Sequence, residues 1–268
     1  MRKVVFERSG LQSTCLAFGT SRLHYLAARK RRAIINLALE LGILHFDTAP
    51  AYGDTIAEIE LGQALARVRD RVVIATKYGI PPNPAIAALP ALAPPLRALR
   101  FVARKAGLWR RDHPAMSAEG LRRSVEQSLR RLRTDRIDIL LLHEPNPGTL
   151  PDPERLLLEL QALQHRGMIR HFGLAGDWDG ILALGEQRKM LGQIVQTNES
   201  QWPPGEPPDI TYGAISTGPQ SFGRPSIDGG TAGQRVARAL ARRANGVVIV
   251  STTSAEHLEH IARLEAAT

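Results

Sequence analysis

The 268-residue sequence predicts a parallel (β/α)8 barrel of the TIM type, and three observations favour this α/β fold class. Short apolar runs such as Val72–Thr76 and Ile139–Leu142 recur along the chain, and such runs are typical of parallel strands buried on both faces. Segments with helical periodicity lie between most of these runs, which favours right-handed crossover connections. The length suits one barrel of roughly 250 residues better than two smaller domains, so we expect a single domain over residues 1–268.

The barrel strands are predicted in eight apolar segments, in this order along the chain: Thr14–Phe18, Leu44–Asp47, Val72–Thr76, Asp138–Leu142, His171–Leu174, Gln193–Thr197, Ile210–Ala214 and Val247–Val250. The helices are predicted in six intervening segments whose apolar residues repeat every three or four positions: Leu26–Leu41, Thr55–Val68, Ala118–Leu132, Pro153–Arg166, Asp179–Leu191 and Ala232–Ala244.

Local signals mark the ends of several predicted helices. Ser117 precedes Ala118 and can cap that helix with its hydroxyl group. Asp152 precedes Pro153, and a proline in the first turn behind an aspartate cap is a strong start signal. The glycines Gly42 and Gly167 stand where their helices should stop, at a position that favours left-handed backbone.

Three segments depart from a regular barrel. Lys3–Leu11 precedes the first predicted strand, and we expect it to form a short hairpin that covers the N-terminal end of the barrel. Ile80–Pro114 is a long insertion between the third strand and the third helix, and its part Arg97–Arg111 predicts a basic amphipathic helix. Ser200–Asp209 contains four prolines, which lack the N–H group that a helix needs, so the sixth helix is predicted to be missing or vestigial.

The net charge of +9 raises the question of a nucleic-acid partner. Arginine dominates this charge, and many arginines fall on predicted helical faces, as Arg122, Arg123 and Arg130 do. No RNP, zinc-finger or homeodomain pattern accompanies them. We therefore interpret them as solvated helix faces and expect no nucleic-acid binding.

Cysteine usage and hydropathy indicate a cytoplasmic protein. The single cysteine, Cys15, excludes an intrachain disulfide and any multi-cysteine metal site, so reducing cytoplasm is the expected compartment and no metal is expected. The segment Met1–Gly10 is charged and lacks the apolar stretch of a signal peptide. No apolar run approaches the roughly 18 residues that a membrane-spanning helix requires.

Polar residues stand at or just beyond the ends of three predicted strands. Asp47 ends the second strand, and Tyr52 follows it by five residues. Lys77 follows the third strand and His143 follows the fourth. Because the carboxyl ends of the strands in such a barrel face one shared site, these four side chains are expected to converge there. A tyrosine beside an ammonium group can protonate a carbonyl oxygen, since the ammonium lowers the pKa of the phenol.

Each of the four residues has an ordinary structural explanation when it is taken alone. An aspartate after a strand is usually a cap or turn residue, and a single lysine or tyrosine usually belongs to the surface. A histidine beside a proline often only satisfies a backbone group. Their joint occurrence, in order and each near a strand end, favours the catalytic interpretation.

The motifs around these residues carry a family resemblance. The stretches Phe46–Gly53 (FDTAPAYG), Thr76–Gly79 (TKYG) and Leu141–Pro145 (LLHEP) resemble the aldo-keto reductase superfamily. The resemblance runs from Arg8–Leu11 to Ala255–Leu258 and so covers nearly the whole chain. It implies a (β/α)8 barrel and an NAD(P)H-dependent oxidoreductase that interconverts an aldehyde, ketone or sugar carbonyl with an alcohol.

The resemblance also implies a role for each of the four residues. Tyr52 matches the residue that donates the proton in reduction and accepts it in oxidation. Lys77 matches the ammonium that lowers the tyrosine pKa, and Asp47 matches the ion-pair partner of that lysine. His143 matches the residue that orients the substrate oxygen.

A nicotinamide dinucleotide is the cofactor that the resemblance implies. The chain contains no Gly-x-Gly fingerprint and no Walker A loop, so neither a Rossmann site nor a P-loop is expected. Gln196 matches the residue that holds the nicotinamide carboxamide, and Tyr212 matches the aromatic residue on which the ring stacks. The usual Ser-Asn pair after the fifth strand is replaced by Ala175-Gly176, so two further carboxamide contacts are missing.

The segment after the eighth strand is the expected phosphate site. Ser251, Thr252 and Thr253 can offer hydroxyl and backbone donors near a helix start. Ser251 and His257 stand where relatives often place lysine and arginine for the 2′-phosphate. The family commonly prefers NADPH, so the resemblance favours NADP(H) over NAD(H).

Two classes of function are compatible with these features. The leading hypothesis is an oxidoreductase acting on a small-molecule carbonyl or alcohol. The alternative is a non-catalytic nucleotide-binding barrel that acts as a sensor or accessory subunit, which the missing helix and the altered cofactor contacts would allow. Membrane or acidic-partner contact through Arg97–Arg111 ranks below a solvated helix. The sequence specifies no oligomeric state.

Overall fold

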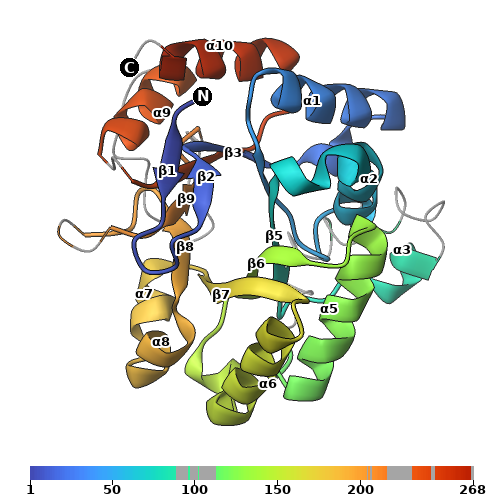
Figure 1. Ribbon diagram of the computed structural model, residues 1–268, viewed down its shortest axis with the longest axis vertical. Helices are drawn as coiled ribbons and strands as arrows, with labels where there is room; N and C mark the ends of the chain where they lie inside the picture. The colour runs from blue at the N-terminus through green and yellow to red at the C-terminus, as the bar shows by residue number, and fades with distance from the viewer. Residues whose placement is uncertain are drawn as a thin grey trace.

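A closed eight-stranded barrel forms the centre of the computed structural model, which describes residues 1–88, 96, 102, 113–203, 205, 207–215, 231–242 and 245–266 (Figure 1). The barrel strands are β3 (Leu16–Gly19), β4 (His45–Asp47), β5 (Val73–Tyr78), β6 (Ile137–His143), β7 (Ile169–Ala175), β8 (Ile194–Asn198), β9 (Ile210–Tyr212) and β10 (Val247–Val250). All neighbours pair in parallel, in the order β10-β3-β4-β5-β6-β7-β8-β9, which confirms the predicted fold class.

Helices surround the barrel. They are α1 (Ala28–Glu40), α2 (Ile56–Leu65), α3 (Pro84–Ala88), α5 (Ala118–Leu132), α6 (Pro153–His165), α7 (Trp178–Leu182), α8 (Glu186–Leu191), α9 (Ala232–Ala241) and α10 (Ala255–Ala266), with short 3-10 turns at Leu23–Tyr25, Ala66–Arg71 and Pro147–Thr149. Because these helices cover the outer faces while side chains fill the interior, the strands are buried on both sides; every residue of β6 is buried.

The four helix-end signals predicted from the sequence are confirmed by hydrogen bonds and backbone angles. The Ser117 hydroxyl accepts a hydrogen bond from the N–H of Gly120 at 3.1 Å. The Asp152 carboxylate accepts one from the N–H of Arg155 at 2.9 Å. Gly42 and Gly167 have φ values of 76° and 71°, in the left-handed region that favours glycine. These ends are therefore fixed by local chemistry.

Two helical regions differ from the sequence expectation. The helix predicted over Asp179–Leu191 consists of two shorter helices, α7 and α8, separated at Gly185, whose φ is 54°. A right-handed helix cannot continue through a positive φ, so the chain changes direction there. The terminal helix α10 was not among the predicted helices.

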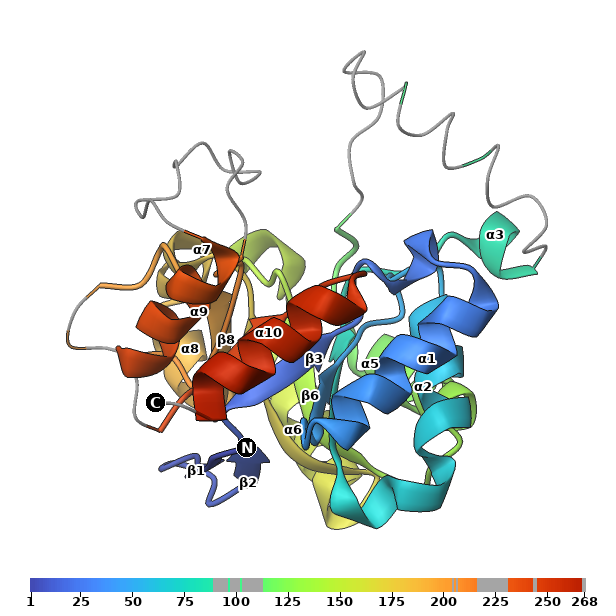
Figure 2. The same ribbon diagram turned by 90° about the horizontal axis from the view of Figure 1, so that it is seen from above.

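The N-terminal hairpin is present but extends beyond the predicted Lys3–Leu11, with β1 (Lys3–Val5) paired antiparallel to β2 (Gln12–Thr14). Thr14 pairs with Lys3, so it belongs to this hairpin, and the first barrel strand begins later than predicted, at Leu16. The hairpin lies apart from the surrounding helices in Figure 2. Val4 and Phe6, in and beside β1, are buried in the hydrophobic core and tie the hairpin to the barrel.

The two predicted irregular segments differ in how much of them the structure describes. Between β8 and β9, the described residues of 199–209 contain no helix, in agreement with the missing sixth helix. After β5, the helix α3 opens the long insertion. The basic helix predicted over Arg97–Arg111 lies outside the described residues apart from Val102. Within the described part of the chain, none of the helices is long and apolar enough to cross a membrane.

Close packing between α2 and α5 gives a first testable prediction. A Cβ atom on Gly62 would lie 2.8 Å from the Cα atom of Leu132, within the backbone at the end of α5. Gly62→Ala should therefore destabilise the protein by about 1 to 3 kcal/mol, because backbone must move to admit the methyl group. The measurement is the free energy of unfolding in urea. The matched control is Gly180→Ala in α7, where a Cβ would meet nothing nearer than 4.0 Å; equal losses for both variants would contradict the packing argument.

Candidate active site

The carboxyl ends of three adjacent strands carry the acidic, cationic and imidazole groups expected from the sequence. Asp47 is the last residue of β4, Lys77 lies next to the end of β5, and His143 is the last residue of β6. Because these strands pair side by side in parallel, their ends lie at the same edge of the barrel. The three side chains are thus presented by rigid strands rather than by loops.

Lys77 and Asp47 form a buried ion pair. The Lys77 ammonium donates to both carboxylate oxygens of Asp47 at 2.7 Å and to the backbone carbonyl oxygen of Thr48 at 3.0 Å. The two residues are 2% and 3% exposed. Burial lowers the pKa of Lys77, and the Asp47 carboxylate opposes this shift by stabilising the charged ammonium.

Tyr52 lies over this ion pair. The Lys77 nitrogen is 5.0 Å from the centroid of the Tyr52 ring. The Tyr52 and His143 rings meet edge to face, with centroids 6.0 Å apart and planes at 84°. The structure therefore brings together all four residues of the predicted catalytic set.

A strained turn positions Tyr52. The three residues that follow it have left-handed backbone, with φ values of 61° at Gly53, 53° at Asp54 and 81° at Thr55. Such values are costly for a β-branched residue and occur mainly where the surrounding structure imposes them. The Asp54 carboxylate accepts a hydrogen bond from the backbone N–H of Asn83 at 2.9 Å, which ties this turn to the segment after β5.

Gln196 and Tyr212 join the site from the other side of the barrel. Gln196, in β8, donates its amide N–H to Asp47 Oδ2 at 2.7 Å, so a residue expected to contact the cofactor also contacts the catalytic set. Tyr212 is the last residue of β9. Burial raises its pKa, and the carboxylates of Asp177 and Glu144 add to that shift, which keeps the phenol neutral.

The residues predicted to bind phosphate form a separate group at the start of α10. Ser251 directly follows β10, and a Cβ on Gly19 of β3 would collide with its hydroxyl group. The Thr252 hydroxyl accepts a hydrogen bond from the N–H of Ser254 at 3.1 Å. The Ser254 hydroxyl accepts one from the N–H of His257 at 3.2 Å. Thr253 and the His257 side chain are exposed.

Two carboxylates near the site were missed by the sequence analysis. Glu144 directly follows His143, and its carboxylate lies 3.5 Å from the imidazole of His113. Asp177 follows β7 by two residues and is half-buried. Burial raises the pKa of Asp177 to about 6, with a contribution from Glu144, while a hydrogen bond with Gln201 opposes the shift. The rule that found Lys77 and His143 would also have found these acids, since both follow predicted strands.

Comparison with known proteins places the chain among aldo/keto reductases. A model of the aldo/keto reductase family matches residues 15–197. The uncharacterized oxidoreductase YcsN of Bacillus subtilis is 36% identical over 146 residues, which are 53% of this chain and 42% of that protein. The L-galactose dehydrogenase of Arabidopsis thaliana is 31% identical over 176 residues, which are 63% of this chain and 46% of that enzyme. The chain spans about half the length of the curated relatives it matches.

Solved structures share the fold at lower sequence identity. A putative aldo-keto reductase from Pseudomonas aeruginosa superimposes with a TM-score of 0.71 at 23% identity, covering 99% of this chain and 95% of its own. An aldo-keto reductase from Klebsiella pneumoniae in complex with NADPH gives a TM-score of 0.66 at 21% identity, covering 98% of this chain and 89% of its own. These likenesses agree with the barrel topology described above.

The raised pKa of Asp177 predicts a pH-dependent stability. In the unfolded chain an aspartate titrates near pH 3.9, whereas in the folded protein Asp177 titrates at about 6. The folded state therefore binds this proton more tightly, and the resulting stabilisation is complete below the unfolded pKa and lost as the pH rises through about 6. Asparagine does not titrate, so Asp177→Asn does not lose this stabilisation. The unfolding free energy of the variant minus that of the parent should therefore be larger at pH 7.5 than at pH 4. Urea unfolding at both pH values measures this difference.

The matched control for this prediction is Asp135→Asn, at an aspartate whose side chain is 86% exposed. The change in unfolding free energy that it causes should differ less between the two pH values than the change caused by Asp177→Asn. A difference between Asp177→Asn and the parent that does not change with pH would contradict the assigned cause.

Proposed function

The chain belongs to the aldo/keto reductase family, and on this premise we propose that it is an NAD(P)H-dependent oxidoreductase that interconverts a carbonyl group and an alcohol. The observation that carries the proposal is the buried Lys77–Asp47 ion pair beside the Tyr52 ring. A buried ion pair has a large desolvation cost, and such groups cluster where a pKa must be tuned for chemistry.

We assign proton transfer to the hydroxyl oxygen of Tyr52. A free tyrosine has a pKa near 10 and is a weak acid at neutral pH. The Lys77 ammonium stabilises the phenolate form and so favours release of the proton toward a substrate oxygen. Asp47 and the Thr48 carbonyl hold that ammonium in place. In the oxidation direction the same phenolate takes the proton from the alcohol.

We assign substrate orientation to His143. It lies at the end of β6, and its ring meets the edge of the Tyr52 ring. A hydrogen bond from its imidazole to the substrate oxygen would hold that atom within reach of the Tyr52 hydroxyl. Orientation of this kind contributes to rate because it fixes the reacting atoms before the proton moves.

The residues present fit a nicotinamide dinucleotide. Gln196 and Tyr212 offer an amide and an aromatic ring beside the catalytic set, while Ser251, Thr252 and Thr253 offer hydroxyl groups at the start of a twelve-residue helix. Hydroxyl groups and free N–H groups at a helix start suit a pyrophosphate. When bound, the cofactor supplies or accepts the hydride. We propose that NADP(H) is preferred over NAD(H), with His257 near the 2′-phosphate.

The substrate class is proposed from the relatives. Proteins named L-galactose dehydrogenase, D-arabinose 1-dehydrogenase and pyridoxal 4-dehydrogenase match this chain, and each oxidises a small hydroxyl- or aldehyde-bearing molecule by name. We propose an aldehyde, ketone or sugar as substrate. We also propose that residues 1–268 act as one domain in the cytoplasm.

Replacement of the proposed acid tests this function. Tyr52→Phe should lower kcat by roughly 100- to 10,000-fold, because the ring remains while the transferable proton is lost. NADPH binding, measured by fluorescence titration, should change little. The control is Tyr25→Phe, at a tyrosine that is 72% exposed. A panel of carbonyls assayed by NADPH oxidation provides the rates. Full activity in Tyr52→Phe would refute the assignment, and NADPH binding without turnover of any carbonyl by the parent would favour a non-catalytic nucleotide sensor.

Cofactor preference gives a second test. The His257 side chain is exposed, and an arginine at this position would form charge-assisted, bidentate hydrogen bonds with a 2′-phosphate. His257→Arg should therefore tighten NADPH binding selectively and leave NADH binding nearly unchanged, as measured by fluorescence titration. An arginine variant with unchanged NADPH affinity would count against the placement of His257.

A further inference from the structure

The aspartate that precedes α7 does not cap that helix. Asp177 stands at the N-cap position, where an aspartate side chain usually accepts a hydrogen bond from the first turn, but its carboxylate makes no such bond. The Gln201 side chain takes that place, because its amide oxygen accepts the backbone N–H of Trp178 at 3.4 Å. The Asp177 carboxylate is itself hydrogen-bonded to the Gln201 side chain. The ordinary structural role of such an aspartate is therefore absent here.

The strand register places Asp177 level with Tyr212. The N–H of Gly176 donates to the carbonyl oxygen of Gln196 at 3.1 Å, so the ladder between β7 and β8 continues past the end of β7. In this register Asp177 lies opposite Asn198, the last residue of β8. Asn198 in turn pairs with Tyr212, the last residue of β9. Asp177, Asn198 and Tyr212 therefore form one row at the carboxyl ends of three adjacent strands.

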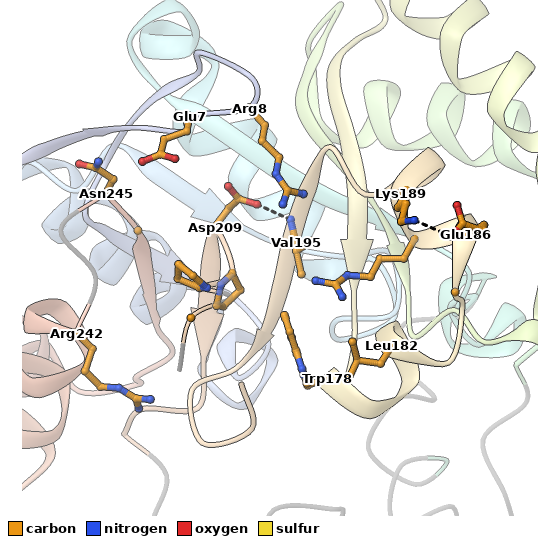
Figure 3. Close-up of a pocket in the computed structure, with 16 residues that line it drawn as sticks. Glu7, Arg8, Trp178, Leu182, Glu186, Lys189, Val195, Asp209, Arg242 and Asn245 are labelled. Atoms are coloured by element: carbon orange, nitrogen blue, oxygen red, sulfur yellow. Dashed lines mark hydrogen bonds and ion pairs between the residues drawn. The ribbon is translucent and has the colours of Figure 1, made fainter. Parts of the chain in front are cut away.

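The Asp177 side chain faces the inside of the barrel. Gln196 points inward, because its amide reaches Asp47 on β4. Residues that lie opposite each other in a sheet, or two positions apart in extended chain, share one face, and the backbone of Asp177 is extended with φ −68° and ψ 145°. The next residue, Trp178, faces the other way: it lines a pocket together with Val195, whose side chain points outward next to Gln196 (Figure 3). Asp177 therefore shares the inward face of Gln196.

The charge of Asp177 reaches the Tyr212 side chain. Burial raises the pKa of Tyr212, and the carboxylate of Asp177 is the strongest of the charges that raise it further. Asp177 is half-buried, so solvent screens this charge only in part. Its hydrogen-bond partner Gln201 is neutral, and among the described residues no cation pairs with it. The row that contains Tyr212 therefore also contains a negative charge without a countercharge.

The other carboxylates around Asp177 and Tyr212 are placed differently. Asp47 is bound by the Lys77 ammonium at 2.7 Å, so its charge is compensated within the barrel. The Glu144 carboxylate lies 3.5 Å from the imidazole of His113. Asp179, which also raises the pKa of Asp177, is exposed on α7. These contacts distinguish Asp177, whose charge faces inward beside a neutral partner.

A carboxylate level with an aromatic ring suits a flat cation. The aromatic face attracts positive charge, and the carboxylate adds a full negative charge beside it. The oxidised nicotinamide ring is a cation of this shape, whereas the reduced ring is neutral. Charges that the protein places near such a ring set the balance between its two redox forms. A negative charge at the level of Tyr212 therefore stabilises the oxidised ring more than the reduced ring.

We propose that Asp177 makes the site favour the oxidised nicotinamide over the reduced one. This inference rests on the proposed function, with Tyr212 as the residue beside the ring. In reduction, the carbonyl carbon gains a hydride from the reduced nicotinamide, the carbonyl oxygen gains the proton of Tyr52, and the ring becomes cationic. Because binding and reaction equilibria are linked, stabilisation of the cationic ring by Asp177 shifts the equilibrium on the protein toward the alcohol.

Nucleotide binding to the full chain tests this inference without an activity assay. At pH 8 the carboxyl group of Asp177, whose pKa is about 6, is ionised. Fluorescence titration gives the Kd of NADPH, and displacement of NADPH gives the Kd of NADP+. Asp177→Asn keeps the size of the side chain and an oxygen for hydrogen bonding but removes the charge. It should raise the Kd of NADP+ at least about threefold and change that of NADPH by less than about twofold.

Two further variants separate charge from structure. Asp177→Glu keeps the charge and should retain most of the preference for NADP+. Asp135→Asn removes a charge from a side chain that is 86% exposed and should leave both Kd values unchanged. Equal weakening of both nucleotides in Asp177→Asn would indicate a structural role and overturn the proposal, as would an unchanged ratio of the two Kd values. If the parent binds neither nucleotide, the proposed function fails together with this inference.

Discussion

The buried ion pair between Lys77 and Asp47 is the constraint on which the rest of the site depends. An ammonium in a protein interior is tolerated only with a close countercharge and further hydrogen bonds, and here Asp47, the Thr48 carbonyl and Gln196 complete that set. The ion pair joins the adjacent strands β4 and β5, whereas the hydrogen bond from Gln196 comes from β8 on the other side of the barrel. The full set of partners therefore exists only in the closed barrel, and folding and the electrostatics of the site are coupled.

Around this rigid pair, Tyr52, Glu144 and Asp177 lie on loops, whereas His143, Gln196 and Tyr212 belong to strands. Tyr52 is placed by a turn with three consecutive positive φ values, which the structure maintains through contacts such as that between Asp54 and Asn83. Burial is the main cause of the raised pKa of Tyr212, and the negative charges of Asp177 and Glu144 raise it further. Strands thus hold the ion pair and its neighbours in place, while loops contribute Tyr52 and two further carboxylates.

The two ends of the barrel differ in what their connections supply. At the carboxyl end, polar residues converge on a buried ion pair. At the amino end, a pocket lies between the hairpin and a connection whose described residues contain no helix, and the guanidinium groups of Arg188 and Arg242 lie over the rings of Trp178 and Trp202 in this region. Both tryptophans belong to the hydrophobic core.

The sequence by itself determined the elements whose signals are local. Apolar runs specified the eight strands, and capping groups such as Ser117 and Gly167 specified helix ends, because these depend on residues a few positions apart. Only the tertiary structure decided which distant groups meet. The contact between Gln196 and Asp47 joins residues 149 positions apart, and the environment of Asp177 combines Glu144, which follows β6, with Gln201, which follows β8. The burial of these polar groups and their contacts with residues far away in the sequence are properties of the closed barrel, so a pattern of a few neighbouring residues cannot predict them.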